Sequence, residues 1–140
     1  MKAHILKPTE SHIEGYARVD VTELTAGLSQ FVDSECDQIF ANDALDAIPG
    51  DKMYEAIKQI VAKLRLRGSV VVGGTDILMF CKNVVSGEIA VNEASNIISA
   101  TESMNTATDV AQALTILGLT INSVTHTGVA HYEIKATRNG

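Results

Sequence analysis

The chain has 140 residues, the size of one domain, and its 46% apolar and 20% charged residues place it among globular proteins rather than disordered ones. A net charge of −6 and 4% aromatic residues argue against nucleic-acid binding, because phosphates are met by clustered Lys and Arg, and unstacked bases by exposed rings. No apolar run is long enough for a membrane span and residues 1–4 lack signal-peptide features, so we expect one cytoplasmic domain over residues 1–140 with no membrane contact.

The amino-terminal part predicts three short strands and one short helix. Residues 3–6 form a strand candidate that Pro8 ends, and residues 16–21 form a second one. Apolar side chains then recur at helical spacing over residues 24–32, and residues 36–41 read as a third strand.

The middle of the chain predicts a strand, helix, strand unit. Asp51 is a candidate N-cap for an amphipathic helix that reaches about residue 65, and Gly68 follows as a stop. The apolar run at residues 69–72 is typical of a strand covered on both faces. A helix between two such strands indicates a parallel crossover, so the predicted fold class is α/β with a mostly parallel sheet.

The carboxyl-terminal part predicts helices and then a hairpin. Residues 76–117 are mostly helical in pattern, although residues 85–105 show no clear periodicity. Gly118 ends the last helix, and two alternating runs over residues 119–125 and 129–137 predict an antiparallel hairpin that closes the sheet.

The cysteines and histidines indicate no metal site and no catalytic nucleophile. Cys36 and Cys81 are far apart in the sequence, each within an apolar run, and the four histidines lack ligand spacing. We therefore expect reduced, buried thiols and assign no catalytic or metal-binding residue.

Four segments, in order, carry a resemblance to a known family. They are FVDSECDQIFA at residues 31–41, ALDAIP at 44–49, LRLRGSVVV at 64–72, and LGL at 117–119 with the strand pair that follows. Together they resemble class I S-adenosylmethionine-dependent methyltransferases over roughly residues 17–138. The resemblance implies a methyltransferase-like, Rossmann-like sheet in which residues 36–41 and 69–72 are the family's fourth and fifth strands.

The amino-terminal part departs from this family. Members hold the methionine part of the cofactor on a glycine-rich loop after the first strand, whereas residues 5–12 here contain no glycine, and Pro8 removes one amide donor. Only 35 residues precede the fourth strand, which predicts an amino-terminally shortened fold that lacks a helix and a strand. In an alternative register, residues 2–7 and 15–20 are the first and second strands, still without the loop.

Three polar residues are candidate cofactor contacts from the resemblance. Asp20 ends a strand where the family places an acid that bonds the ribose or adenine of the cofactor; alternatively, it caps the next helix. Asn42 and Asp43 follow the fourth strand, where open α/β sheets bind ligands, but both residue types also favour turns. Asp46 and Ala47 replace a Glu and a His of the family pattern.

Gly73 and Gly74 are the remaining candidates. They follow the predicted fifth strand, where missing side chains would let a ligand approach the backbone. Alternatively, they form a flexible turn in which Thr75 or Asp76 caps the next helix.

Two hypotheses for function follow. In the first, the chain is a methyltransferase-like domain with degraded cofactor binding that acts as a non-catalytic binding or assembly module. A sheet face that has lost a helix would expose apolar surface, so we expect a homo-oligomer or a protein partner, and no cofactor in the isolated chain. In the second, it is a minimal methyltransferase of unknown acceptor that binds S-adenosylmethionine through Asp20, Asn42 and the Gly73–Gly74 turn.

Overall fold

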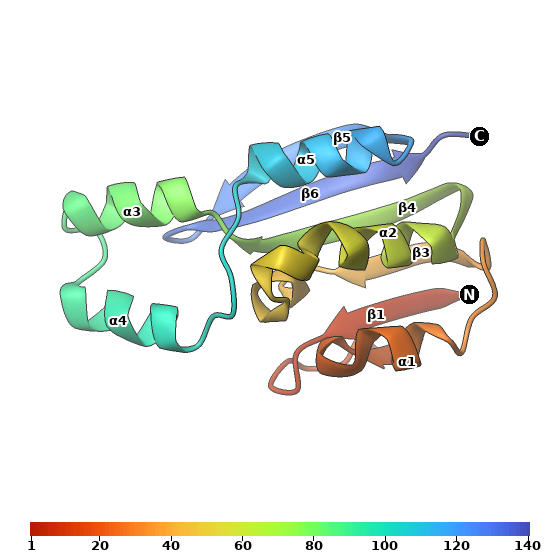
Figure 1. Ribbon diagram of the computed structural model, residues 1–140, viewed down its shortest axis with the longest axis horizontal. Coiled ribbons are helices and arrows are strands. Elements are labelled where there is room, and N and C mark those ends of the chain that lie inside the picture. The colour runs from red at the N-terminus through yellow and green to blue at the C-terminus, as the bar shows by residue number, and fades with distance from the viewer.

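The computed structural model describes all residues, 1–140, and is built on one six-stranded sheet (Figure 1). The strands are β1 (Lys2–Leu6), β2 (Ala17–Asp20), β3 (Cys36–Ala41), β4 (Leu64–Thr75), β5 (Leu119–Thr127) and β6 (His131–Arg138). The α-helices are α1 (Leu24–Leu28), α2 (Met53–Lys63), α3 (Ile77–Val85), α4 (Val91–Ser99) and α5 (Ala107–Ile116), and the 3₁₀ turns are η1 (Val21–Glu23), η2 (Ala44–Ala47) and η3 (Gly50–Lys52). None of the helices has the length and apolar character that a membrane crossing requires.

The strand order is β2-β1-β3-β4-β6-β5. The first four strands are parallel, and β6 pairs antiparallel with both β4 and β5. This confirms the α/β class, the parallel pairing of residues 36–41 with residues 69–72, and the carboxyl-terminal hairpin. The pairing of β1 with β2 agrees with the alternative register of the amino-terminal segment.

The crossover between β3 and β4 is α2, whose buried stripe includes Met53, Ile57 and Ile60. The helix is shorter than residues 51–65, because η3 precedes it and Asp51 makes no capping hydrogen bond. At its other end Leu64 already pairs with Cys36, so β4 begins four residues before Gly68.

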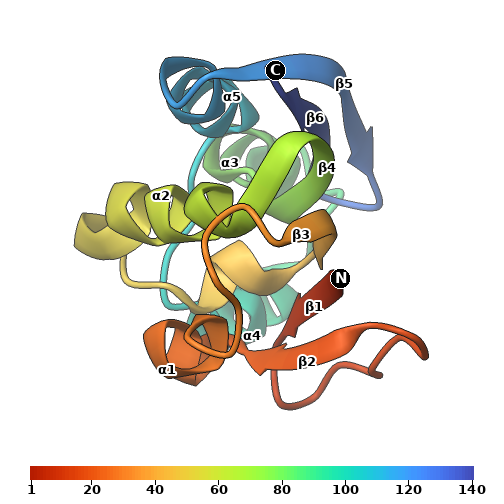
Figure 2. The same cartoon turned by 90° about the vertical axis from the view of Figure 1, so that its right-hand side faces the viewer.

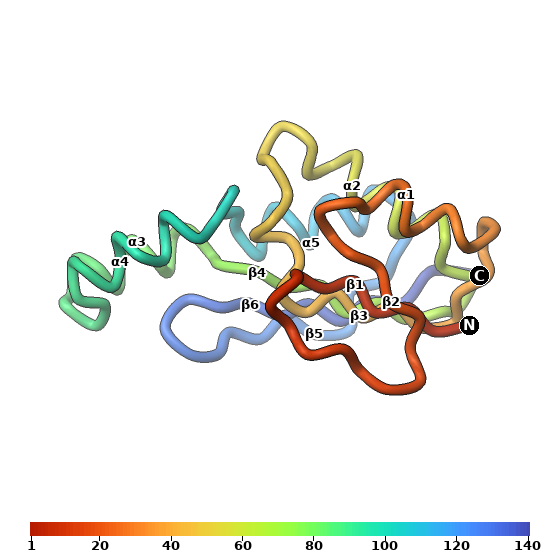
Figure 3. The backbone as a smooth tube through the Cα atoms, turned by 90° about the horizontal axis from the view of Figure 1, so that it is seen from below, coloured from red at the N-terminus to blue at the C-terminus, as the bar shows by residue number.

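All the helices that cover the sheet, α1, α2 and α5, lie on one of its faces (Figures 2 and 3). Val70 and Val72 belong to the core on that face, whereas Val71 is not part of this cluster. The helices therefore cover only one face of the strand at residues 69–72, although Val71 is buried on the other face as well. A run of β-branched residues does not distinguish a strand with helices on both faces from a strand with helices on one face only.

The opposite face of the sheet carries both polar and apolar side chains, and the apolar ones include Phe40 and Val71. Paired positions on neighbouring strands share a face, and one such row runs through Lys2, Gln38, Ser69 and Thr137. The loop over residues 7–16 covers part of this face: the Tyr16 hydroxyl donates to Gln38 Oε1 at 2.8 Å. Because Phe40 is only partly buried there, this face is mixed rather than uniformly apolar.

Helices α3 and α4 form an arm that extends beyond the carboxyl ends of the parallel strands (Figure 1). A small cluster of Phe80, Ile89, Ala94 and Ala130 ties the arm to the hairpin between β5 and β6. Residues 85–105, which show no clear periodicity, contain α4.

Candidate functional site

The sheet has a switch point between β1 and β3. From β1 the chain moves to β2 on one side, and it later returns to β3 and β4 on the other, so the carboxyl ends of β1 and β3 diverge. Crevices at such points are where open α/β sheets bind ligands. Lys7 directly follows β1, and Asn42 and Asp43 directly follow β3.

An ion pair bridges this crevice. Lys7 Nζ lies 2.5 Å from Asp43 Oδ2, and His131 Nε2 lies 3.5 Å from Asp43 Oδ1 and 3.0 Å from the Asn42 carbonyl oxygen. The three charged side chains are half-buried, with exposed fractions of 27%, 32% and 27% for Lys7, Asp43 and His131. The structure therefore brings the predicted Asn42 and Asp43 together with Lys7 and His131, which were not predicted.

The pKa directions agree with a mutually stabilised cluster. Burial alone would raise the pKa of Asp43, but hydrogen bonds from His131 and Lys7 outweigh it and hold that pKa below its ordinary value. The hydrogen bond with Asp43 raises the pKa of His131, against the opposing effect of burial. At neutral pH the carboxylate of Asp43 is consequently ionised, and its negative charge is already balanced by the side chains beside it, Lys7 and His131.

Asp46 ties η2 to the end of β4. Its two carboxylate oxygens accept hydrogen bonds from the Thr75 amide and the Thr75 hydroxyl, both at 2.6 Å. The side chain is buried, and burial raises its pKa. The residue that replaces the Glu of the family pattern is thus bonded to the neighbouring strand.

Gly73 and Gly74 lie inside β4 rather than in a turn after it, which corrects the sequence-based placement. A Cβ on Gly73 would lie 2.2 Å from the Asn42 carbonyl oxygen, and one on Gly74 would lie 2.7 Å from Asp46 Oδ1. Both glycines are explained by the close approach of the segment that follows β3.

Asp20 caps η1. Its Oδ1 accepts hydrogen bonds from the Thr22 amide at 2.9 Å and the Thr22 hydroxyl at 2.7 Å. Those hydrogen bonds lower its pKa. The structure thus shows Asp20 in the capping role, the alternative that the sequence left open, at the end of β2 and in register with Leu6 of β1.

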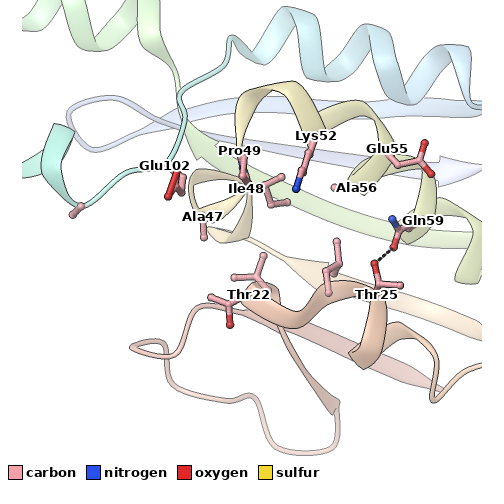
Figure 4. A pocket seen from close by; sticks show the side chains of 13 residues that line it. Thr22, Thr25, Ala47, Ile48, Pro49, Lys52, Glu55, Ala56, Gln59 and Glu102 are labelled. Carbon is pink, nitrogen blue, oxygen red and sulfur yellow. Dashed lines mark hydrogen bonds between the residues drawn. The ribbon is translucent and has the colours of Figure 1, made fainter.

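Two cavities border the carboxyl edge. The smaller, about 400 Å³, is lined by Lys7, Asp43, Asp46, Thr75 and His131 and by apolar residues of the arm and hairpin. The larger, about 780 Å³, lies between the η1–α1 segment and the start of α2 (Figure 4). Its lining includes Lys52 and Glu55 but no paired titratable groups, so the smaller cavity is the candidate site.

The comparisons with known proteins identify the fold. No family model and no curated protein sequence matches the chain, but many solved structures do. A SAM-dependent methyltransferase from Archaeoglobus fulgidus matches with a TM-score of 0.58 at 9% identity, over 88% of this chain and 67% of that one. The chain has a class I S-adenosylmethionine-dependent methyltransferase-like fold.

Two further structures agree with this methyltransferase-like fold. An O-methyltransferase family protein from Burkholderia thailandensis gives a TM-score of 0.59 at 14% identity, over 89% of this chain and 36% of that one. A SAM-dependent methyltransferase from Methanosarcina mazei gives 0.55 at 13% identity, over 89% and 66%. The present chain thus spans between about one third and two thirds of the length of these structures, and identities this low concern the fold alone.

The segment after β1 does not fit the cofactor of this fold. The Lys7 amide donates to Glu10 Oε1 and the Glu10 amide donates to the Lys7 carbonyl, both at 3.0 Å, while Pro8 has no amide hydrogen. Of the four positions from Lys7 to Glu10, two therefore use their amide inside the turn and one has no amide hydrogen.

Proposed function

We propose that this chain is a methyltransferase-like domain that does not hold S-adenosylmethionine and acts as a binding or assembly module. The observation that carries the proposal is the Lys7–Asp43 ion pair across the switch-point crevice. The amino-acid end of the cofactor carries one carboxylate and one ammonium group, and in this fold it lies at that crevice. Here the chain's own ammonium and carboxylate groups meet there instead.

The energetic consequence of the missing donors is large. Losing two or three hydrogen bonds to charged groups, each worth about 1.5–3 kcal/mol, weakens binding by about 3–6 kcal/mol. Because each 1.4 kcal/mol is about a factor of ten, a micromolar dissociation constant becomes millimolar or weaker. Asp20 offsets at most part of this loss, since its Oδ1 is already engaged by Thr22 and only Oδ2 is left for a cofactor.

A second candidate function is a minimal methyltransferase, and one observation favours it. The cavity of about 780 Å³ begins at Val21 and Thr22, directly after β2, where the resemblance places the adenosine end of the cofactor. Asn42 Oδ1 is also buried without a hydrogen-bond partner near this edge. A cofactor held only by its adenosine end would use these features.

Thermal shift with S-adenosylmethionine and S-adenosylhomocysteine separates the two functions. At about 100 μM ligand, a millimolar dissociation constant stabilises the fold by less than about 0.1 kcal/mol, so no shift is expected. A dissociation constant of 50 μM would give about 0.6 kcal/mol, a shift of about 2 °C for a chain of this length. A shift of that size that Asp20→Ala abolishes, and that the exposed control Asp51→Ala retains, would establish the minimal methyltransferase instead.

A further inference from the structure

The two edges of the sheet differ in how they are protected. At one edge, β2 is only four residues long and contains the exposed Arg18. The Gln30 side chain also donates to the Arg18 carbonyl oxygen at 3.2 Å. Short length, charge and side-chain bonding are the devices that prevent an edge strand from pairing with another chain.

At the other edge, β5 lacks most of these devices. It has nine residues, LTINSVTHT, with no Asp, Glu, Lys, Arg or Pro. Its only protecting feature is a register irregularity between Ile121 and Ser123. The side-chain hydrogen bonds near its ends, from Thr120 to Asn139 and between His126 and Asp76, leave its outward backbone groups free. Such a row of N–H and C=O groups is a template for another strand.

The depletion of charge extends from β5 to α5, which lies alongside it (Figure 2). Between Thr106 and Thr127 the only charged residue is Asp109, although 20% of the whole chain is charged. The exposed residues of α5 are Thr108, Asp109, Gln112, Thr115 and Ile116, and Ile116 is 66% exposed. Surfaces that face only solvent are rich in charge, whereas the cores of protein interfaces are depleted of it.

We infer that β5 is a self-association edge, which pairs antiparallel with β5 of a second copy of this chain. A two-fold axis perpendicular to the sheet near Ser123, the middle of the strand, joins the two sheets into one. That symmetry keeps both α5 helices on the same face, side by side. No charged side chains meet across the strand pair, so a second identical copy fits without like-charge repulsion.

This inference rests on the assembly part of the proposed function and names β5 as the surface through which the chain assembles. It does not depend on cofactor binding. The competing surface for self-association is the α3–α4 arm, which exposes Leu78, Val85 and Val91. The arm has apolar side chains but no unpaired strand edge, so it serves as the matched comparison.

Sedimentation velocity of the full chain between about 1 and 100 μM tests the β5 edge. The variants Val124→Lys and Val124→Glu place like charges near each other across the two-fold axis. Each is expected to weaken the dimer about tenfold or more. An equimolar mixture of Val124→Lys and Val124→Glu should recover a heterodimer. The control Val91→Lys makes the same change on the arm and should leave the dimer intact, and circular dichroism checks that each variant is folded.

The outcomes are distinguishable. If Val124→Lys and Val124→Glu, both folded, each dimerise like the wild type, or if Val91→Lys dissociates the dimer, the assignment to β5 is wrong while the assembly function stands. If the wild type is monomeric at 100 μM, the assignment and the assembly function both fail. Dissociation by the β5 variants alone, with heterodimer recovery, supports the assignment.

Discussion

Lys7→Met is the substitution that reports most directly on the ion pair at the switch point. It removes the ammonium group 2.5 Å from Asp43 and keeps an aliphatic side chain of similar length. Exposed ion pairs contribute about 0–1 kcal/mol, whereas breaking a fully buried pair costs about 3–5 kcal/mol. Because the side chains of Lys7 and Asp43 are 27% and 32% exposed and His131 stays beside Asp43, we expect a loss of about 1–2 kcal/mol at pH 7.

That loss has a predictable size in a thermal melt and a predictable pH dependence. With an unfolding entropy of about 2.1 cal/mol/K per residue, it lowers Tm by about 3–7 °C. The lowered pKa of Asp43 means that its contribution is present above its ordinary value of 3.8 and is lost as the pH falls through the folded pKa. The raised pKa of Lys7 means that its contribution is present below 10.5 and is lost as the pH rises through the folded pKa. The effect of Lys7→Met should therefore shrink in acid as Asp43 is protonated, and it should grow as the pH rises through the raised pKa of His131, because Lys7 is then the only cation beside Asp43.

Urea unfolding followed by circular dichroism measures this change. The matched control is Lys58→Met, since Lys58 is exposed on α2 and forms no ion pair. We expect the control to stay within about 0.5 kcal/mol of the wild type. If Lys7→Met is equally neutral at pH 7, the pair does not hold the crevice together and the reasoning about the closed site is refuted.

Two further substitutions test the packing and the titration of the same cluster. Gly73→Ala brings a Cβ within 2.2 Å of the Asn42 carbonyl oxygen and should lower the free energy of unfolding by more than about 2 kcal/mol. In the control Gly50→Ala, the nearest atom to the new Cβ is 3.8 Å away, so the change in stability should be close to zero. Equal stability of the two variants in urea would show that β4 does not approach Asn42. His131→Gln should destabilise the fold more at pH 6 than at pH 9, because the raised pKa of His131 gives a contribution that is full below 6.5 and lost as the pH rises through the folded pKa. A difference from the wild type that grows with pH would contradict the bond to Asp43.

Much of the fold could be predicted from local patterns. The strand at residues 36–41, the helix that follows and the hairpin after Gly118 each have a period that identifies them, and their order fixes the parallel crossover. Gly118, with a φ of +91°, ends α5 where expected. The uncovered sheet face could not be predicted in the same way, because Val70, Val71 and Val72 form one apolar run although only two of them face the helices.

The site was predictable only in part. Asn42 and Asp43 were found because residues at the carboxyl end of a parallel strand lie at the ligand-binding edge. Lys7 follows β1 at the same edge, and the same rule would have found it. His131 belongs to an antiparallel strand far along the chain, and nothing in its local spacing points to Asp43. Asp20 was given a cofactor role as one of two alternatives, and the structure shows it capping η1.

Isothermal titration calorimetry of the full chain with S-adenosylmethionine, and separately with S-adenosylhomocysteine, tests the central claim most directly. The ion pair across the crevice and the loss of the Lys7, Pro8 and Glu10 amides as ligand donors predict no measurable heat of binding, equivalent to a dissociation constant of about 1 mM or weaker. A dissociation constant below about 50 μM for either ligand would contradict the account, because the Lys7–Asp43 pair and the turn after β1 would then not prevent cofactor binding.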